Sequence, residues 1–241
     1  MKIAFFSDVH ANLPAFKALL EDLDELQPDM VYCLGDLVGY NVWPNEVVSK
    51  LRERRIPTIM GNHDEFLMLP EDPNPLSNKA ITRKIVNEET KNYLINLPRQ
   101  IDLKFQLSDA PLNIHLTHGS PKAINDYLVE YYPEEDVLEM LKQVKSDILL
   151  CGHTHKQYHR LIPVENKFKH IINVGSVGKP KDGDARLCYA VLTFNETNPS
   201  IDKNALKVEF RRKEYDVEGA MDAIYNSDYP DDFANALNLA R

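Results

Sequence analysis

Short apolar runs alternate with stretches of helical periodicity over the first sixty residues. Ile3–Ser7 is mostly apolar and has the length of a strand, whereas the apolar residues of Leu13–Gln27 recur at helical spacing. The same pair of patterns follows in Met30–Leu34 and Pro44–Arg54, and Ile56–Met60 reads as a third strand. This alternation predicts right-handed crossovers and a largely parallel sheet.

The pattern changes in the second part of the chain. Pro70–Pro75 contains three prolines and predicts a surface loop, and Asn78–Asn96 predicts one helix. Strands are expected at Ile101–Leu107, Asn113–Leu116, Ile148–Cys151, His170–Val174, Arg186–Phe194 and Ala205–Arg212. Further helices are expected at Glu134–Val144, Val217–Tyr225 and Asp231–Leu239. Because the sequence shows no repeat and no linker, we expect a single domain, residues 1–241, with a short helical C-terminal tail.

Composition narrows the class of protein. Hydrophobic residues make up 43% of the 241, enough for a sizeable core, and no stretch approaches the roughly 20 apolar residues that cross a bilayer. The apolar run near the start, Ile3–Phe6, is too short for the hydrophobic region of a secretory signal. The three cysteines are far apart and match neither a disulfide framework nor a Cys-x-x-Cys site. We therefore expect a soluble, cytoplasmic protein without membrane contact. The formal net charge of −9 argues against nonspecific nucleic-acid binding.

Polar motifs follow the predicted strands. In chain order they are Asp8-Val9-His10, Gly35-Asp36, Gly61-Asn62-His63-Asp64, His118-Gly119 and Gly152-His153-Thr154-His155. Loops at strand ends converge in one crevice, and glycine lets the backbone turn tightly there. Turns and caps would explain any one motif, but not five of them in this arrangement.

The donor types of these motifs indicate metal chemistry. Carboxylate, imidazole and amide oxygen together suit Mn, Fe or Zn better than calcium. Two such ions about 3.5–4 Å apart can hold a bridging hydroxide for in-line attack on phosphorus. They would also supply the positive charge that an acidic protein needs to attract phosphate. The motifs therefore predict a two-metal phosphoesterase.

Taken in order, the five motifs resemble the signature of the calcineurin-like metallophosphoesterase superfamily over about Lys2 to Val191. The resemblance implies an α/β fold, a four-layer αββα sandwich of two mixed β-sheets flanked by helices. It implies two divalent metal ions, for which we expect Mn²⁺, with Fe, Zn, Ni and Mg as alternatives. The implied ligands of one metal are Asp8, His10, Asp36 and His155. Those of the other are Asp36 (bridging), Asn62, His118 and His153, with His63 as general acid.

Two segments resemble the small bacterial and archaeal phosphodiesterases of this superfamily more closely. They are Gly35–Tyr40 leading to Pro44-Asn45-Glu46, and Asn173–Gly178. Serine/threonine phosphatases and dinucleoside tetraphosphatases carry a phosphate-clamping arginine shortly after the Gly-Asp pair, where this chain has Leu37–Tyr40. A phosphodiester in a small phosphorylated substrate is therefore favoured. The alternatives are phosphomonoesterase or nucleotide phosphatase activity at the same site, and a non-catalytic scaffold such as the retromer subunit of this superfamily.

Several residues keep two interpretations. Asp64 can orient His63 or cap the helix that starts near Glu65, and Asn12 can cap a helix or contact the substrate phosphate. Lys179, Lys181 and Arg186 form a solvated turn or reach the far end of a substrate. Three other histidines are expected to be structural or solvated: His115, His159 and His170. The pocket walls are expected from Tyr40–Trp43, Pro70–Asn78 and Tyr127–Pro133, and the sequence leaves the oligomeric state open, homo-oligomers included.

Overall fold

The structure is a computed structural model that describes residues 1–241 except 108–109, 166 and 195–205. The strands are β1 (Lys2–Phe6), β2 (Met30–Cys33), β3 (Gln100–Leu107), β4 (Ala110–Thr117), β5 (Ile148–Cys151), β6 (Tyr158–Val164), β7 (Lys167–Asn173), β8 (Leu187–Phe194) and β9 (Leu206–Lys213). The helices are α1 (Leu13–Leu26), α2 (Pro44–Glu53), α3 (Asn62–Glu65), α4 (Asn78–Ile85), α5 (Glu88–Ile95), α6 (Glu134–Gln143), α7 (Val217–Tyr225) and α8 (Asp231–Leu239), with a 3₁₀ turn at Phe66–Met68.

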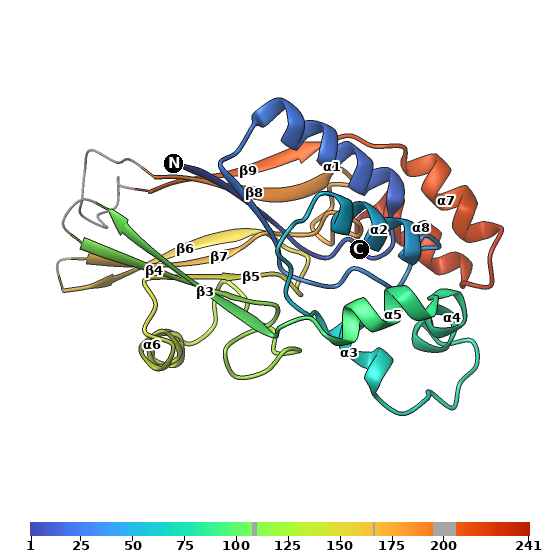
Figure 1. The fold of residues 1–241 in the computed structure, drawn as a ribbon, viewed down its shortest axis with the longest axis horizontal. Helices are drawn as coiled ribbons and strands as arrows, with labels where there is room; N and C mark the ends of the chain where they lie inside the picture. The colour runs from blue at the N-terminus through green and yellow to red at the C-terminus, as the bar shows by residue number, and fades with distance from the viewer. Residues whose placement is uncertain (108–109, 166, 195–205) are drawn as a thin grey trace.

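Two β-sheets lie face to face with helices outside them (Figure 1). One sheet has the strand order β2-β1-β8-β9 and the other β3-β4-β5-β7-β6. Both are mixed: β1 pairs in parallel with β2 and antiparallel with β8, and β5 is parallel to β4 and β7 while β3 and β6 run antiparallel at the edges. The predicted fold class, α/β with two mixed sheets flanked by helices, is confirmed.

Strand β1 shows how the layers form. Its side chains alternate between the two faces of the sheet, as the pleat requires. Ile3 and Phe5 pack into the core between the sheets, where Leu116 of β4 also lies, while Phe6 faces α1 and contacts Phe16. Since both faces are covered, every one of these side chains is buried, and a nearly continuous apolar run is what such a strand needs.

Helix α1 is also fixed to the sheet by a partly buried ion pair. Asp22 accepts two hydrogen bonds of 2.9 Å from the guanidinium of Arg211 in β9 and one of 2.6 Å from the Tyr189 hydroxyl in β8. These bonds satisfy the carboxylate of the nearly fully buried Asp22, so they set the position of α1 across the sheet.

Two predicted elements differ from the structure. Ile56–Met60 is not a strand: it makes a single bridge, Cys33 to Thr58, because Pro57 has no N–H to continue a ladder. The helix predicted over Asn78–Asn96 is two helices, since Val86 leaves the helical region and Asn87 caps α5 by accepting from the N–H of Thr90.

Strand β6 was not predicted. It is an edge strand with a proline, Pro163, and polar residues between its apolar ones, so its pattern lacks a strand's clear signal. The other predicted strands and helices match within a few residues at each end, as expected of element boundaries. Ala205, the predicted start of the last strand, lies outside the described residues.

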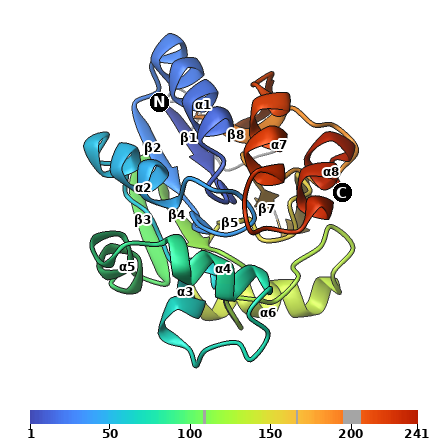
Figure 2. The same ribbon diagram turned by 90° about the vertical axis from the view of Figure 1, so that its right-hand side faces the viewer.

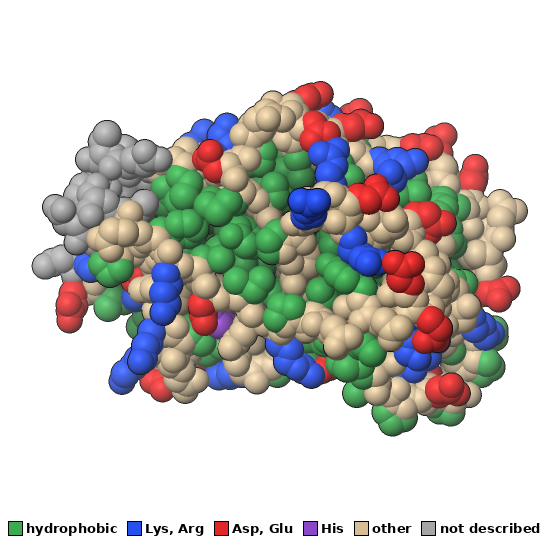
Figure 3. Space-filling view, viewed as in Figure 1, with side chains coloured by type: hydrophobic (Ala, Val, Ile, Leu, Met, Phe, Trp, Pro, Cys, Tyr) green, Lys and Arg blue, Asp and Glu red, His purple; other side chains and the backbone are tan. Residues whose placement is uncertain are grey.

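The tail helices α7 and α8 pack against each other beside α1, as Figure 2 shows, and both match their predicted ranges. On the face seen in Figure 3, the described acidic and basic side chains are interspersed and form no continuous basic patch. Among the described helices, none is long and apolar enough to span a bilayer.

Candidate metal centre

The five polar motifs converge at one end of the two sheets, and their backbone is unusual. Five of the seven predicted metal ligands have positive φ: Asp8, His10, Asp36, His153 and His155. The left-handed region is costly for residues other than glycine, and such residues gather where function requires them. Gly35, also at positive φ, lies so close to Gly61 that an added Cβ would be 2.4 Å from its backbone nitrogen. The two loops therefore touch backbone to backbone.

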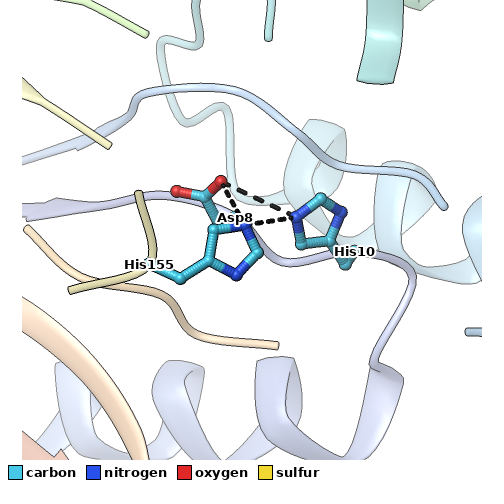
Figure 4. Close-up of side chains that lie close together, drawn as sticks. All are labelled: Asp8, His10 and His155. Atoms are coloured by element: carbon cyan, nitrogen blue, oxygen red, sulfur yellow. Dashed lines mark hydrogen bonds and ion pairs between the residues drawn. The ribbon is translucent and has the colours of Figure 1, made fainter. Parts of the chain in front are cut away.

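One cluster consists of Asp8, His10 and His155, and Figure 4 shows the three side chains pointing toward one another. Nε2 of His155 lies 3.2 Å from Oδ1 of Asp8 and 3.1 Å from Nε2 of His10. Oδ2 of Asp36 approaches the same Nε2 of His10 at 3.7 Å. The structure thus brings together the four residues predicted for the first metal.

A second cluster shares Asp36. Nε2 of His118 lies 3.2 Å from Oδ2 of Asp36 and 3.1 Å from Oδ1 of Asn62. His153 joins this group, with ligand atoms of Asp36, His118 and His153 all within 4.8 Å of one another. The four residues predicted for the second metal are therefore adjacent, and Asp36 stands between the two clusters.

Backbone carbonyls orient all four imidazoles of these clusters. The pairs are His10 Nδ1 with Val38 O (3.0 Å), His118 Nδ1 with Leu34 O (2.8 Å), His155 Nδ1 with Lys179 O (2.5 Å) and His153 Nε2 with Asn125 O (3.2 Å). A carbonyl only accepts, so each of these ring nitrogens carries the proton. The other nitrogen of each neutral ring is left with a bare lone pair facing the centre, the arrangement that holds histidine as a metal ligand.

The carboxylates complete a site made of acceptors. Within the described residues, Asp8 Oδ1 and Asp36 Oδ2 are buried oxygens without a hydrogen-bond partner. A buried, unpaired carboxylate oxygen is costly, and two facing imidazole lone pairs repel each other. Divalent cations between these atoms remove both costs, so the residues fit the implied metals.

Neighbouring charges shift the pKa values of the residues in the centre. Burial opposes ionisation of Asp36, but His118 and His63 outweigh it and hold the pKa of Asp36 well below its usual value. Burial likewise opposes the charged form of His118, yet the carboxylates of Asp36 and Asp8 raise the pKa of His118 to about 10. A cation that binds at His118 must therefore displace a proton.

His63 lies beside the first cluster, its ring centroid 4.8 Å from that of His10. Asn78 fixes its tautomer. Oδ1 of Asn78 accepts from the N–H of Tyr40 at 2.8 Å, so Nδ2 must be the end that faces Nδ1 of His63 at 3.3 Å. The amide donates, His63 Nδ1 accepts, and the ring proton sits on Nε2. Burial lowers the pKa of His63 to about 3, so the imidazole is neutral at pH 7.

Asp64 is fully buried, and its carboxylate accepts three backbone N–H bonds of 2.9 Å, from Asp36, Leu37 and Gly61. Burial, together with the charge of Asp36, raises its pKa to about 7. These contacts tie the Gly35-Asp36 loop to the start of α3. They favour the capping interpretation of Asp64 over contact with His63, although α3 begins at Asn62 and not near Glu65.

Asn12 caps α1: its Oδ1 accepts from the N–H of Ala15 at 3.1 Å, and its Nδ2 donates to Gly178 O and to the Tyr215 hydroxyl. The side chain is buried and its donors and acceptor are used, which favours the capping interpretation. Contact with a substrate phosphate stays a prediction.

The sequence did not indicate the roles of two residues that support the centre, although Asn78 ends a segment expected as a pocket wall. Asn78 opens α4, and Asn125, whose carbonyl orients His153, lies in a loop; neither stands near a motif. Only their spatial contacts reveal them. The three histidines expected to be structural lie in strands, where His115 pairs with Asp102 at 2.7 Å and His159 with His170 at 3.1 Å.

Comparison with known proteins agrees with this geometry. Residues 1–197 match the family model described as the calcineurin-like phosphoesterase superfamily domain. The chain is 31% identical to the uncharacterized protein MJ0912 of Methanocaldococcus jannaschii, over 99% of this chain and 98% of that protein. It is 26% identical to the phosphodiesterase YfcE of Escherichia coli, over 76% of this chain and 83% of YfcE.

Among solved structures, a metallophosphoesterase from Sphaerobacter thermophilus superposes with a TM-score of 0.79 at 27% identity, and the match covers 100% of both chains. The family model spans the ordered motifs and both metal clusters. The chain therefore belongs to the calcineurin-like phosphoesterase superfamily.

Proposed function

We propose that this protein hydrolyses phosphodiesters with two divalent cations. The observation that carries the proposal is the pair of buried ligand clusters that share Asp36, with the Nε2–H of His63 beside them. The ligands would be Asp8, His10, Asp36 and His155 for one cation, and Asp36, Asn62, His118 and His153 for the other. When bound, two divalent ions neutralise phosphate charge and lower the pKa of a coordinated water.

The residues of the chain would hold the metal ligands in position before the cations and the substrate bind. Oδ1 of Asp36 accepts a hydrogen bond of 2.7 Å from the backbone N–H of His63, whereas Oδ2 has no hydrogen-bond donor. The bond to Oδ1 holds the carboxylate in position between the clusters. The four carbonyl-oriented imidazoles are aimed inward before any ligand arrives, and His118 presents its lone pair once a cation displaces its proton. Such preorganisation spares the site the cost of rearranging during the reaction.

His63 would act on the leaving group. Its proton is held on Nε2 by the bond from Asn78, so it is available to an oxygen of the bound ester. As the ester bond breaks, negative charge develops on the leaving oxygen, and the Nε2–H of the neutral His63 ring would donate a hydrogen bond to that oxygen. The negative charge of the bound ester favours the charged ring, and in that form His63 would transfer its Nε2 proton to the leaving oxygen as general acid and become neutral again.

Two observations support a diester over a monoester. Related phosphatases carry an arginine where this chain has Leu37–Tyr40, so this segment contributes no cation to the site. A monoester carries two negative charges and a diester one, so the lack of this cation weakens monoester binding more. The relative YfcE is named a phosphodiesterase. We expect Mn²⁺ as the metal, because nitrogen and oxygen donors in this mixture suit it; Fe, Zn, Ni and Mg are the alternatives to test.

The test is hydrolysis of bis(p-nitrophenyl) phosphate by the purified protein with each metal added in turn. We expect the fastest turnover with Mn²⁺, a lower rate on p-nitrophenyl phosphate, and large losses in His63→Ala and Asp36→Asn. A faster rate on the monoester would replace the diester assignment with a monoesterase. If the metal-loaded protein hydrolyses neither compound above the blank, the enzyme proposal fails.

A further inference from the structure

A pocket of about 500 Å³ opens beside the metal centre, a volume typical of sites for small ligands. Its walls come from three segments that are far apart in the sequence: the Tyr127–Tyr131 loop, the Thr154–Tyr158 turn and the Lys181-Asp182 pair. The sequence indicated the first of these as a pocket wall and Lys181 as an alternative substrate contact.

The pocket lies next to the predicted ligands of the centre, although none of them lines it. Thr154, which lines it, stands between the ligands His153 and His155 in the chain. The ring centroid of Tyr127 lies 4.4 Å from that of His153, and the N–H of Lys181 donates to the carbonyl of His155 at 3.2 Å. A phosphate held at the centre would therefore have one of its substituents at the mouth of this pocket.

Two tyrosine rings at the pocket are available for stacking. Tyr127 is 57% exposed and Tyr131 is 86% exposed, although both are large and mostly apolar. The third tyrosine of the pocket, Tyr158, is buried and donates its hydroxyl to Leu128 O, so it forms a wall. Flat exposed rings bind other flat rings, and stacking of a nucleobase on an aromatic side chain is a common form of this contact.

The pocket also contains two lysine ammonium groups that an anionic ligand could contact. Across the described residues, neither the Lys156 nor the Lys181 ammonium has a hydrogen bond or ion pair, and Lys181 is only partly exposed. Of the two acidic lining residues, Asp182 is already paired with Arg212 and Glu130 has no such partner, while the carboxylates of Asp8 and Asp36 act on Lys181 from the neighbouring centre. A ligand with an anionic group would satisfy these ammonium groups.

We propose that this pocket binds a nucleoside bearing a further phosphate group, as the half of the diester that stays at the metal centre when the leaving group departs. The inference rests on the proposed function. His63 lies against His10, whereas Tyr127 of the pocket lies against His153, so the leaving oxygen would meet His63 while the retained nucleoside would meet Tyr127. A small aliphatic substituent would leave the tyrosines unused, and a ring without added charge would leave the lysines unpaired.

Three substrates with one leaving group test the inference: methyl p-nitrophenyl phosphate, thymidine 5′-(p-nitrophenyl phosphate) and the same compound with a 3′-phosphate. With Mn²⁺, we expect kcat/KM to rise at each step, by about fivefold or more for the ring. Tyr131→Leu should remove the increase in kcat/KM from the methyl ester to the thymidine ester. Lys156→Gln should remove the further increase that the 3′-phosphate gives. Tyr225→Leu and Lys142→Gln, exposed residues on α7 and α6, should keep both ratios.

A binding measurement without metal separates this inference from the proposed function. Calorimetry with thymidine 3′-phosphate in EDTA reports on the pocket alone, and we expect binding that Tyr131→Leu weakens at least about fivefold. If all three substrates react at equal kcat/KM and thymidine 3′-phosphate does not bind, the pocket assignment is wrong while the phosphodiesterase proposal stands. Binding with no hydrolysis of any substrate would support the pocket and overturn the proposed function.

Discussion

The side-chain amide of Asn78 donates from Nδ2 to Nδ1 of His63 across 3.3 Å. The direction of this bond follows from a second one, because the backbone N–H of Tyr40 can only donate and lies 2.8 Å from the amide oxygen of Asn78. Gly39, which directly precedes Tyr40, leaves room for the side chains of Asn78 and His63, because a Cβ at Gly39 would lie 2.7 Å from Nδ1 of His63. Asn78 is thus a positioning residue that decides which nitrogen of His63 carries the proton.

Asn78→Leu should lower kcat by about 10- to 100-fold with little change in KM, because the His63 proton is no longer held on Nε2. Asn78→Asp should behave differently. A carboxylate accepts from Nδ1–H and stabilises the charged ring, so the pKa of His63 rises and the basic limb of the pH–rate profile, on which a general acid loses its proton, moves to higher pH. The measurement is kcat against pH on bis(p-nitrophenyl) phosphate.

The matched control is Asn92→Leu on the exposed face of α5. It should leave both kcat and the profile as in the wild type. Equal profiles for Asn78→Asp and the wild type would show that Asn78 has no influence on His63.

Metal removal should destabilise the protein. The buried oxygens of Asp8 and Asp36 without donors, and the facing nitrogens of His10 and His155, are relieved by cations. With Mn²⁺ at 100 times its dissociation constant, we expect about 2.7 kcal/mol of added stability, seen as a higher Tm than in EDTA. Asp36→Asn should abolish most of this increment and lower activity by more than about 100-fold. A Tm that does not respond to Mn²⁺ would contradict the metal assignment.

The sequence predicted much of this centre because its residues come in short motifs at strand ends. Asp8 and His10 follow β1, and Asp36 follows β2, so a strand pattern and a local motif suffice to place them. Glycines beside the ligands signalled the tight backbone that the positive φ angles show.

Contacts between distant segments were beyond such reasoning. Asn78 meets His63 only because a proline-rich loop returns to the site, and no periodicity encodes that return. Ile56–Met60 has a strand's apolar pattern, yet it forms only one bridge, since pairing depends on which N–H groups the neighbour can reach. The break between α4 and α5 is a local feature, and Asn87, an N-cap residue type, was the signal for it.

Acid should weaken the fold partly through His170. Burial, together with neighbouring His159, lowers the pKa of His170 from 6.5 to about 4. Between these values the unfolded chain binds a proton that the folded protein does not, so stability is present above pH 6.5 and is lost as pH falls toward 4. The loss from this residue should be about 2–3 kcal/mol.

Urea unfolding at pH 7 and pH 4.5 in EDTA measures this loss. His63 and His155, whose pKa values burial also lowers, act in the same direction, so the wild type should lose more than His170 alone explains. His170→Phe should reduce the difference between the two pH values. An unchanged difference would mean that His170 is not the residue that titrates.

The last prediction concerns the tail, which lies beyond the residues that match the family model. Phe233 of α8 packs edge-on against the ring of Tyr40, with centroids 5.1 Å apart, and Tyr40 in turn lies 4.9 Å from His63 and 4.8 Å from His10. The ammonium of Lys179, whose carbonyl orients His155, donates to Arg241 O at 2.8 Å. The tail thus supports the side of the centre where His63 lies.

Phe233→Ala should therefore cost both stability and activity. Phe233 is half-buried, so we expect about 2 kcal/mol of lost stability, less than for a fully buried ring, and a fall in kcat/KM of about tenfold as Tyr40 and His63 gain freedom. The control is Met221→Ala on α7. Met221 is also half-buried and packs against the apolar cluster between α7 and α8, but it takes no part in these ring contacts. It should lose stability and keep kcat/KM at a temperature well below either Tm. If Phe233→Ala behaves as Met221→Ala does, the tail stabilises the fold without shaping the site.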